Sequence, residues 1–237
     1  MKTLGIIGGL GPMATIYFME LVVKMTKANA DRDHIPMIIY SYPDTPDRTE
    51  YLLDKTKPNP LPSILNMGTK LVEQGVDYVA MPCITAHYFG AKLDDKLNHK
   101  FINMIEETAK FLKEKGVTKI GLMATDGTVK SAVFEHTLNE YGIEVALPSF
   151  EGQKKVMHVI YDQVKAGKEV SVDDMYEVKK ELTDKGAQVI ILGCTELSVV
   201  KGNYTLDSDF LDVLEILAKR SVELCGATLN DEYSYLQ

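Results

Sequence analysis

The sequence has few basic residues, few cysteines and no long apolar run. Its 26 Lys and Arg are outnumbered by 34 Asp and Glu. This balance argues against nucleic-acid binding, because phosphate recognition needs clustered cations. No apolar stretch reaches the roughly 18 residues of a membrane span. The N-terminus lacks a long apolar region with a cleavage site, so residues 2–8 are predicted to form a first strand and the protein to be cytoplasmic.

Three cysteines without close pairing do not make a disulfide framework, so they are expected to be reduced thiols. The five histidines show no metal-ligand spacing, and no Gly-Lys-Ser/Thr phosphate loop is present. Residues 9–14 match a dinucleotide-binding loop, but the acidic residue expected about 20 positions later is missing from the end of the second strand. A loop whose amides bind a smaller anion is therefore favoured.

Two short stretches of the chain resemble each other. Residues 75–85 and 186–196 each contain a glycine, a run typical of a buried strand, and a cysteine eight positions after the glycine. Residues 3–11 likewise resemble residues 119–127. Both pairs keep the same order, at offsets of 111 and 116 residues. The sequence therefore predicts an internal duplication.

Strands that alternate with helices predict an α/β fold. We expect two pseudo-symmetric lobes, each a mostly parallel sheet flanked by helices, with the active site in the cleft between them. Residues 1-100 plus 208-237 are assigned to the first lobe and 101-207 to the second. The polar segment 41–62 is too long for an ordinary connection and is expected to be a lid or a binding loop. Residues 195–208 are expected to form a polar loop, followed by a helix over 209–224.

The two matching cysteines, Cys83 and Cys194, follow predicted strands, where ligands bind in parallel sheets. A buried free cysteine is often only a core residue, and Cys225 within a predicted helix is interpreted in this way. Thr85 and Thr195 lie close behind the other two cysteines, and their hydroxyls can bind a carboxylate or cap a helix. A helix start also stabilises a thiolate. Two thiols facing one cleft can take a proton from one face of a carbon and return one to the other face, which inverts a stereocentre without a cofactor.

Three motifs, at residues 5–12, 82–87 and 193–197, resemble those of the aspartate/glutamate racemase family and specifically its cofactor-independent aspartate racemases. The resemblance covers nearly the whole chain. It implies a two-lobed, usually dimeric enzyme that acts on a small acidic amino acid without cofactor or metal. Cys83 and Cys194 are then the paired bases.

The resemblance also implies a set of substrate-binding residues. Arg48 and Lys165, which would otherwise be interpreted as solvated surface charges, match the family's basic residues for substrate carboxylates. Thr125 matches a residue that contacts the α-amino or α-carboxylate end, and Leu10 is expected to contribute a backbone contact. Ile84 stands where the family usually has Asn, so the substrate is expected to be held differently there. The full predicted binding set is Leu10, Arg48, Ile84, Thr85, Thr125, Lys165 and Thr195.

Three questions stay open at this level. Whether His87 or Glu196 assists the thiols is undecided, and for His87 a surface or helix-start position is favoured over a catalytic one. A related cysteine isomerase or decarboxylase acting on another dicarboxylate is the alternative enzyme. A non-catalytic binding protein that retains the cleft is the alternative of another class. The presence of both cysteines with Arg48 and Lys165 favours racemisation.

Overall fold

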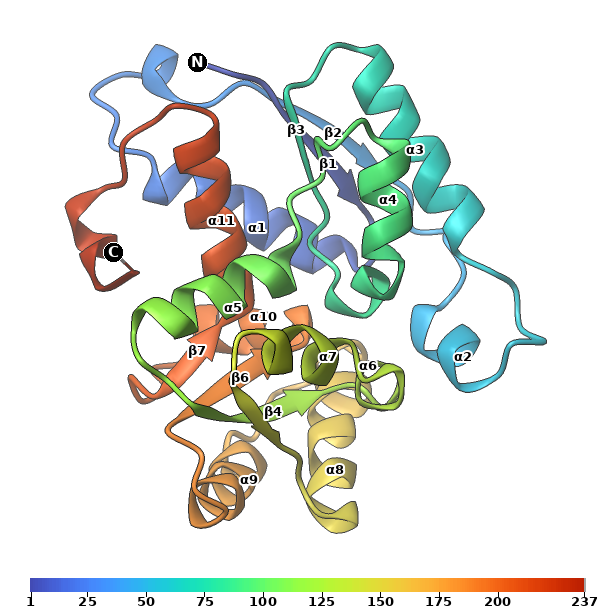
Figure 1. Ribbon diagram of the computed structural model, residues 1–237, viewed down its shortest axis with the longest axis vertical. Coiled ribbons are helices and arrows are strands. Elements are labelled where there is room, and N and C mark those ends of the chain that lie inside the picture. The colour runs from blue at the N-terminus through green and yellow to red at the C-terminus, as the bar shows by residue number, and fades with distance from the viewer. Residues whose placement is uncertain (237) are drawn as a thin grey trace.

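The computed structural model describes residues 1–236 and contains two parallel β-sheets with helices packed on them (Figure 1). The strand order is β2-β1-β3 in the first sheet and β5-β4-β6-β7 in the second, and every strand pair is parallel. This confirms the predicted fold class. The strands are β1 (Leu4–Gly8), β2 (Met37–Ser41), β3 (Tyr78–Ala80), β4 (Lys119–Ala124), β5 (Glu144–Ala146), β6 (Val189–Gly193) and β7 (Phe210–Asp212).

Helices surround both sheets. In the first, α3 packs against all three strands and α11 contacts β3 from the opposite side; in the second, α8 and α9 contact β4 (Figure 1). The helices are α1 (Pro12–Met25), α2 (Arg48–Leu53), α3 (Leu61–Glu73), α4 (Gly90–Lys96), α5 (Met104–Glu114), α6 (Asp126–Ser131), α7 (Val133–Glu140), α8 (Phe150–Met157), α9 (Asp173–Asp184), α10 (Thr195–Asn203) and α11 (Val213–Leu224), with 3₁₀ turns η1 (Asp31–Asp33), η2 (Ile84–Phe89) and η4 (Asp231–Leu236) and the π-helical segment η3 (His158–Val164).

The two sheets repeat one arrangement. β1 and β4 are central strands, each paired on one side with the next strand along the chain and on the other with the strand that precedes a cysteine. β1 is buried at every residue, which explains its continuous apolar sequence. Because β3 and β6 occupy equivalent positions, Cys83 and Cys194 follow equivalent strand ends.

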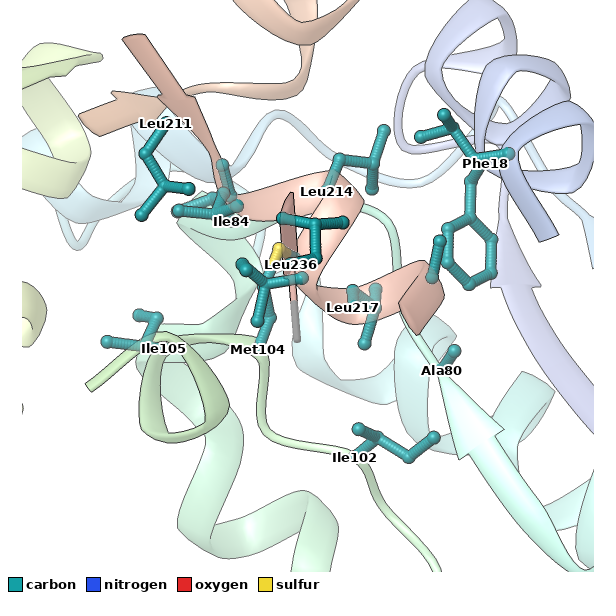
Figure 2. Packing of buried hydrophobic residues seen from close by; sticks show 14 of the residues in the cluster. Phe18, Ala80, Ile84, Ile102, Met104, Ile105, Leu211, Leu214, Leu217 and Leu236 are labelled. Carbon is teal, nitrogen blue, oxygen red and sulfur yellow. The ribbon is translucent and has the colours of Figure 1, made fainter. Parts of the chain in front are cut away.

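A large apolar cluster lies between the sheets and joins them. It contains residues of α1, α5 and α11 together with Ile6 from β1 and Leu122 from β4. Figure 2 shows Ile84 in this cluster near Leu211 and Leu214. Separate clusters fill the spaces on the outer sides of the two sheets. This shared core holds the carboxyl ends of the two sets of strands in a fixed relation.

The structure corrects two expectations. Residues 195–203 are helical and not a polar loop: α10 packs against α1, α11 and η3. A helix buried on several sides lacks the single apolar stripe that identifies a helix in a sequence. The helix expected over 209–224 begins with a short strand, β7. The long segment 41–62 contains α2, which packs against α6 of the second sheet region; that this segment is a lid or a binding loop stays a prediction.

The lobe boundaries stay a prediction. Strand β7 lies within 208-237 yet pairs with β6 of the second sheet, whereas α11 packs against α1 and α5. The C-terminal segment therefore contacts both halves. Among residues 1–236, no helix is long and apolar enough to cross a membrane.

Candidate active site

A small cavity, partly open to solvent, lies at the carboxyl ends of the strands and takes residues from both sheet regions. The space between its lining atoms is about 280 Å³ when the part open to solvent is included, but the centres of water-sized molecules can occupy only about 10 Å³ of it, which is room for about one water. The lining includes every residue of the predicted site. It consists of Leu10, Asp47, Arg48, Thr49, Cys83, Ile84, Thr85, Thr125, Lys165, Cys194, Thr195 and Glu196.

Cys83 lies between β3 and η2 and is 5% exposed. The Arg48 guanidinium is the cation beside it. His87 supports the segment that carries Cys83, because its Nδ1 lies 3.0 Å from the Cys83 carbonyl oxygen. His87 is buried, not at the surface as favoured above, and burial lowers its pKa to about 4. A neutral imidazole outside the cavity lining supports the loop, and nothing places it on the substrate.

Cys194 has the opposite electrostatic surroundings. It is 4% exposed at the N-terminus of α10, and its Sγ donates a hydrogen bond of 2.8 Å to Glu196 Oε2. Burial first, and then the Glu196 carboxylate, raise the pKa of Cys194 well above its usual value, although Lys165 acts in the other direction. The helix-start argument predicted a stabilised thiolate; at Cys194 burial and Glu196 outweigh it. One cavity thus holds one thiol beside a cation and one beside a carboxylate.

Arg48 is the first residue of α2, and three backbone carbonyl groups fix its guanidinium. Its Nη2 donates to the Leu10 carbonyl oxygen at 2.5 Å, and its Nη1 donates to those of Thr45 and Pro46. The opening loop thus supplies a backbone contact at Leu10, directed to the arginine. Arg48 Nε is buried and has no hydrogen-bond partner among residues 1–236. With three of the five N–H donors of this rigid fork bonded to carbonyl groups, Nε–H is available to a ligand.

Lys165 reaches the cavity from the end of η3. The π-helical turn shows in the hydrogen bond from the Lys165 amide to the Ile160 carbonyl, which is five residues back. Its Nζ lies 3.9 Å from Asp47 Oδ2 and 4.0 Å from Glu196 Oε1. Burial lowers the pKa of Lys165, but Glu196 and the other neighbouring groups raise it by more, so the net pKa is raised and the ammonium stays charged.

Ile84 belongs both to the cavity wall and to the apolar core. It lines the cavity beside Cys83, yet it is only 1% exposed and packs in the central apolar cluster with Leu211 and Leu214 (Figure 2). At this position the cavity wall therefore has neither a hydrogen-bond donor nor an acceptor. The wall is also part of the contact between the two sheets.

Three lining residues are not in the predicted site, although the role of one of them, Glu196, was left open. Asp47 and Thr49 flank Arg48, and Glu196 follows Cys194 by two residues. The signal for Glu196 was its acidic side chain just behind a candidate catalytic thiol, at the start of a helix that was interpreted as a loop. Asp47 caps α2 by accepting a hydrogen bond from the Glu50 amide, which is the usual role of Asp at that place.

The glycines of the opening loop serve close backbone packing. Gly9 has a φ of +85°, and a Cβ there would lie 2.4 Å from the Tyr42 amide nitrogen. Its own amide donates to Thr15 Oγ1. In residues 1–236, no group of three or more His, Cys, Asp and Glu is arranged to hold a metal ion.

Fold and cavity together define a two-sheet α/β protein with a buried pair of thiols between cationic side chains. The chain belongs to the Asp/Glu/Hydantoin racemase family, whose family model matches residues 7–220. Membership makes it an enzyme of the isomerase class.

Individual relatives cover almost the whole chain. It is 28% identical over 223 residues to the broad specificity amino-acid racemase RacX of Bacillus subtilis, a match over 92% of this chain and 96% of the relative. The aspartate racemase structure from Picrophilus torridus is 31% identical, with a TM-score of 0.81 over 100% of this chain and 99% of the other. Glutamate racemase from Francisella tularensis, in complex with D-glutamate, shares the fold at 15% identity, with a TM-score of 0.65 over 99% of this chain and 82% of that one.

Proposed function

We propose that the protein racemises aspartate or a similar acidic amino acid without a cofactor, with Cys83 and Cys194 as the two bases. The observation that carries the proposal is the cavity itself: two buried thiols from equivalent strand ends line one small space together with Arg48 and Lys165. Two fixed cations suit the two carboxylates of an acidic amino acid. The likeness to an aspartate racemase supports this choice of substrate.

The surroundings of the thiols support different starting roles. Cys83, which lies beside the Arg48 guanidinium, takes the α-proton, so that a carbon–hydrogen bond breaks and a sulfur–hydrogen bond forms. Cys194, hydrogen-bonded to Glu196, starts as the thiol and gives its proton to the opposite face of the carbon. The other enantiomer reacts by the same steps in reverse, from the enzyme form in which the thiol and the thiolate have exchanged.

The carbanion between the two steps needs stabilisation. Its charge spreads into the α-carboxylate as an enediolate, and fixed donors around that group lower the barrier. In the described part of the chain Arg48 Nε has no hydrogen-bond partner. The Lys165 ammonium and the hydroxyls of Thr85, Thr125 and Thr195 line the same cavity. Burial of these groups strengthens their effect on the developing charge.

Hydrogen exchange at the α-carbon is the direct test. In heavy water and without pyridoxal phosphate, the protein should convert L-aspartate into an equal mixture of enantiomers and place deuterium at the α-carbon. Chiral chromatography and proton magnetic resonance follow the two events separately. The remaining amino acids are then screened after the acidic ones. Absence of inversion and exchange with all of them would exclude racemisation, and release of carbon dioxide would favour the decarboxylase.

Replacing Arg48 by lysine tests carboxylate binding. Lysine keeps the charge but loses the planar fork that is held by three carbonyl groups. We expect kcat/KM for aspartate to fall by about 10–100-fold, the range for a hydrogen bond to a charged group. Steady-state kinetics measure the loss. The matched control is Arg220→Lys at the ion pair with Glu107 outside the cavity, which should leave kcat/KM unchanged. Equal values for both variants would remove Arg48 from the proposed site.

Three further expectations accompany the proposal. We expect the protein to form a homodimer and to be located in the cytoplasm. Sedimentation velocity of the purified protein tests whether it is a dimer. We also expect the small acidic substrate to be bound without a cofactor or metal.

A further inference from the structure

The Lys165 ammonium lies over the face of an aromatic ring. Its Nζ is 3.9 Å from the centre of the Tyr161 ring, well within the roughly 6 Å over which such a face attracts a cation. Tyr161 precedes Lys165 by four residues and belongs to the π-helical segment η3, which ends directly before Lys165. The ring therefore contributes to the position of the ammonium at the cavity.

Two carboxylates lie beside the same ammonium without bonding closely to it. Lys165 Nζ is 3.9 Å from Asp47 Oδ2 and 4.0 Å from Glu196 Oε1, whereas a hydrogen bond from nitrogen to oxygen needs about 3.2 Å or less. Because the lysine side chain is flexible, small rotations would bring the ammonium into hydrogen-bonding contact with either carboxylate. An ammonium paired in that way is less available to a carboxylate of the substrate. The aromatic face opposes this pairing, because it attracts the ammonium to a place between the two carboxylates.

Tyr161 lies behind the cavity wall and is not part of it. Lys165 lines the cavity, whereas Tyr161 lines a separate open groove bordered by α2, α6, α8 and η3. The ring of Tyr161 faces Lys165, and its hydroxyl interacts with Thr49, another lining residue. An effect of the Tyr161 ring on substrate binding would therefore act through Lys165. The ring and the hydroxyl can be removed separately by substitution.

We propose that Tyr161 is a positioning residue, which keeps the Lys165 ammonium available to a carboxylate of the substrate and prevents it from pairing with Asp47 or Glu196. A ligand that needs one arrangement of the protein binds more weakly in proportion to the fraction of molecules that lack this arrangement. The Tyr161 ring raises the fraction with the ammonium in place before the substrate binds. The inference rests on the proposed racemisation and explains how a cation beside two carboxylates remains free for a third.

Three variants separate the ring from the hydroxyl and from general stability. Tyr161→Leu keeps an apolar side chain but removes the ring, and Tyr161→Phe removes only the hydroxyl. Tyr176→Leu is the matched control. Tyr176 is also half-buried, packs against the same apolar cluster and lies 5.5 Å from a lysine, Lys179, but it lines neither the cavity nor the groove. Calorimetry gives the Kd for L-aspartate, steady-state kinetics give kcat and KM, and thermal unfolding gives stability.

For Tyr161→Leu we expect the Kd and KM for L-aspartate to rise about 10-fold, the size of a partly buried contact between a cation and a ring. We expect kcat to stay close to that of the wild type, because the bound substrate draws the ammonium back into place. Tyr161→Phe should restore Kd and KM, and Tyr176→Leu should change only stability. An unchanged Kd in Tyr161→Leu, a loss that phenylalanine does not restore, or an equal rise in Tyr176→Leu would overturn the inference.

The same measurements distinguish the inference from the proposed function. A wild type that binds L-aspartate without inverting it overturns the proposed function alone, because the comparison of Kd values still applies. A wild type that inverts L-aspartate while Tyr161→Leu binds it equally well overturns the inference alone. A wild type that neither binds nor inverts it overturns both.

Discussion

Replacing Cys83 or Cys194 by alanine should lower the rate of racemisation by about 10²–10⁴-fold, the range for loss of a general acid or base. Each thiol is expected to serve one face of the α-carbon, so neither substitutes for the other. The variants should nonetheless differ in hydrogen exchange. Cys194→Ala retains the Cys83 base, which can remove the α-proton of one enantiomer and return a deuteron to the same face. Exchange without inversion is therefore expected for that enantiomer, and Cys83→Ala should exchange only the other one.

The third cysteine provides the control. Cys225 is buried at the end of α11 and does not line the cavity. Cys225→Ala should keep the rate of inversion, although removing a buried side chain lowers stability. The measurement is chiral chromatography for inversion and proton magnetic resonance in heavy water for exchange. Full inversion by either cavity variant would exclude a mechanism with two thiol bases, as would exchange of both enantiomers by a single variant.

The positions of the two thiols could be predicted because they depend on local sequence. A glycine, a buried strand and a cysteine, repeated once, place Cys83 and Cys194 at the carboxyl ends of equivalent parallel strands. Such ends lie at the ligand-binding edge of a sheet whatever the rest of the fold contains. Thr85 and Thr195 follow from the same local argument. The α/β class was predictable for the same reason, since it depends on alternation along the chain.

Contacts between distant segments could not be predicted from local sequence. Lys165 reaches the cavity at the end of a π-helical turn, which local sequence does not reveal. Thr49 approaches so close to α6 that a Cβ at Gly127 would lie 2.8 Å from its Cα. That approach exists only after the two halves have packed. Arg48 and Lys165 accordingly resembled surface charges until the family resemblance placed them.

Because residues 195–208 were predicted to form a loop, the contact between Glu196 and Cys194 was not predicted. With residues 195–203 in a helix, Glu196 lies in its first turn and its carboxylate accepts the thiol hydrogen of Cys194. A loop prediction leaves the direction of that side chain open. The difference matters because the helix N-terminus favours a thiolate, whereas burial and Glu196 raise the pKa of Cys194.

Glu196→Gln should move the alkaline limb of the kcat/KM profile to lower pH. The pKa of Cys194 is raised by burial and then by the negative charge of Glu196. Glutamine keeps the shape and an acceptor oxygen but removes the charge, so the pKa of Cys194 falls. Activity that needs the Cys194 thiol is then lost at a lower pH. A neighbouring charge typically shifts a pKa by about 1–3 units, and each unit lowers kcat/KM about 10-fold above the limb, since one proton is involved.

Either enantiomer can be used for this measurement. The equilibrium constant of a racemisation is one, so kcat/KM is the same in both directions at every pH, and the shift must appear equally from L- and from D-aspartate. Glu215→Gln is the control, because Glu215 is also buried and paired with a lysine, Lys201, but lies outside the cavity. Its profile should match that of the wild type. An unmoved limb in Glu196→Gln, or an equal shift in both variants, would mean that the carboxylate beside Cys194 does not hold the proton that racemisation requires.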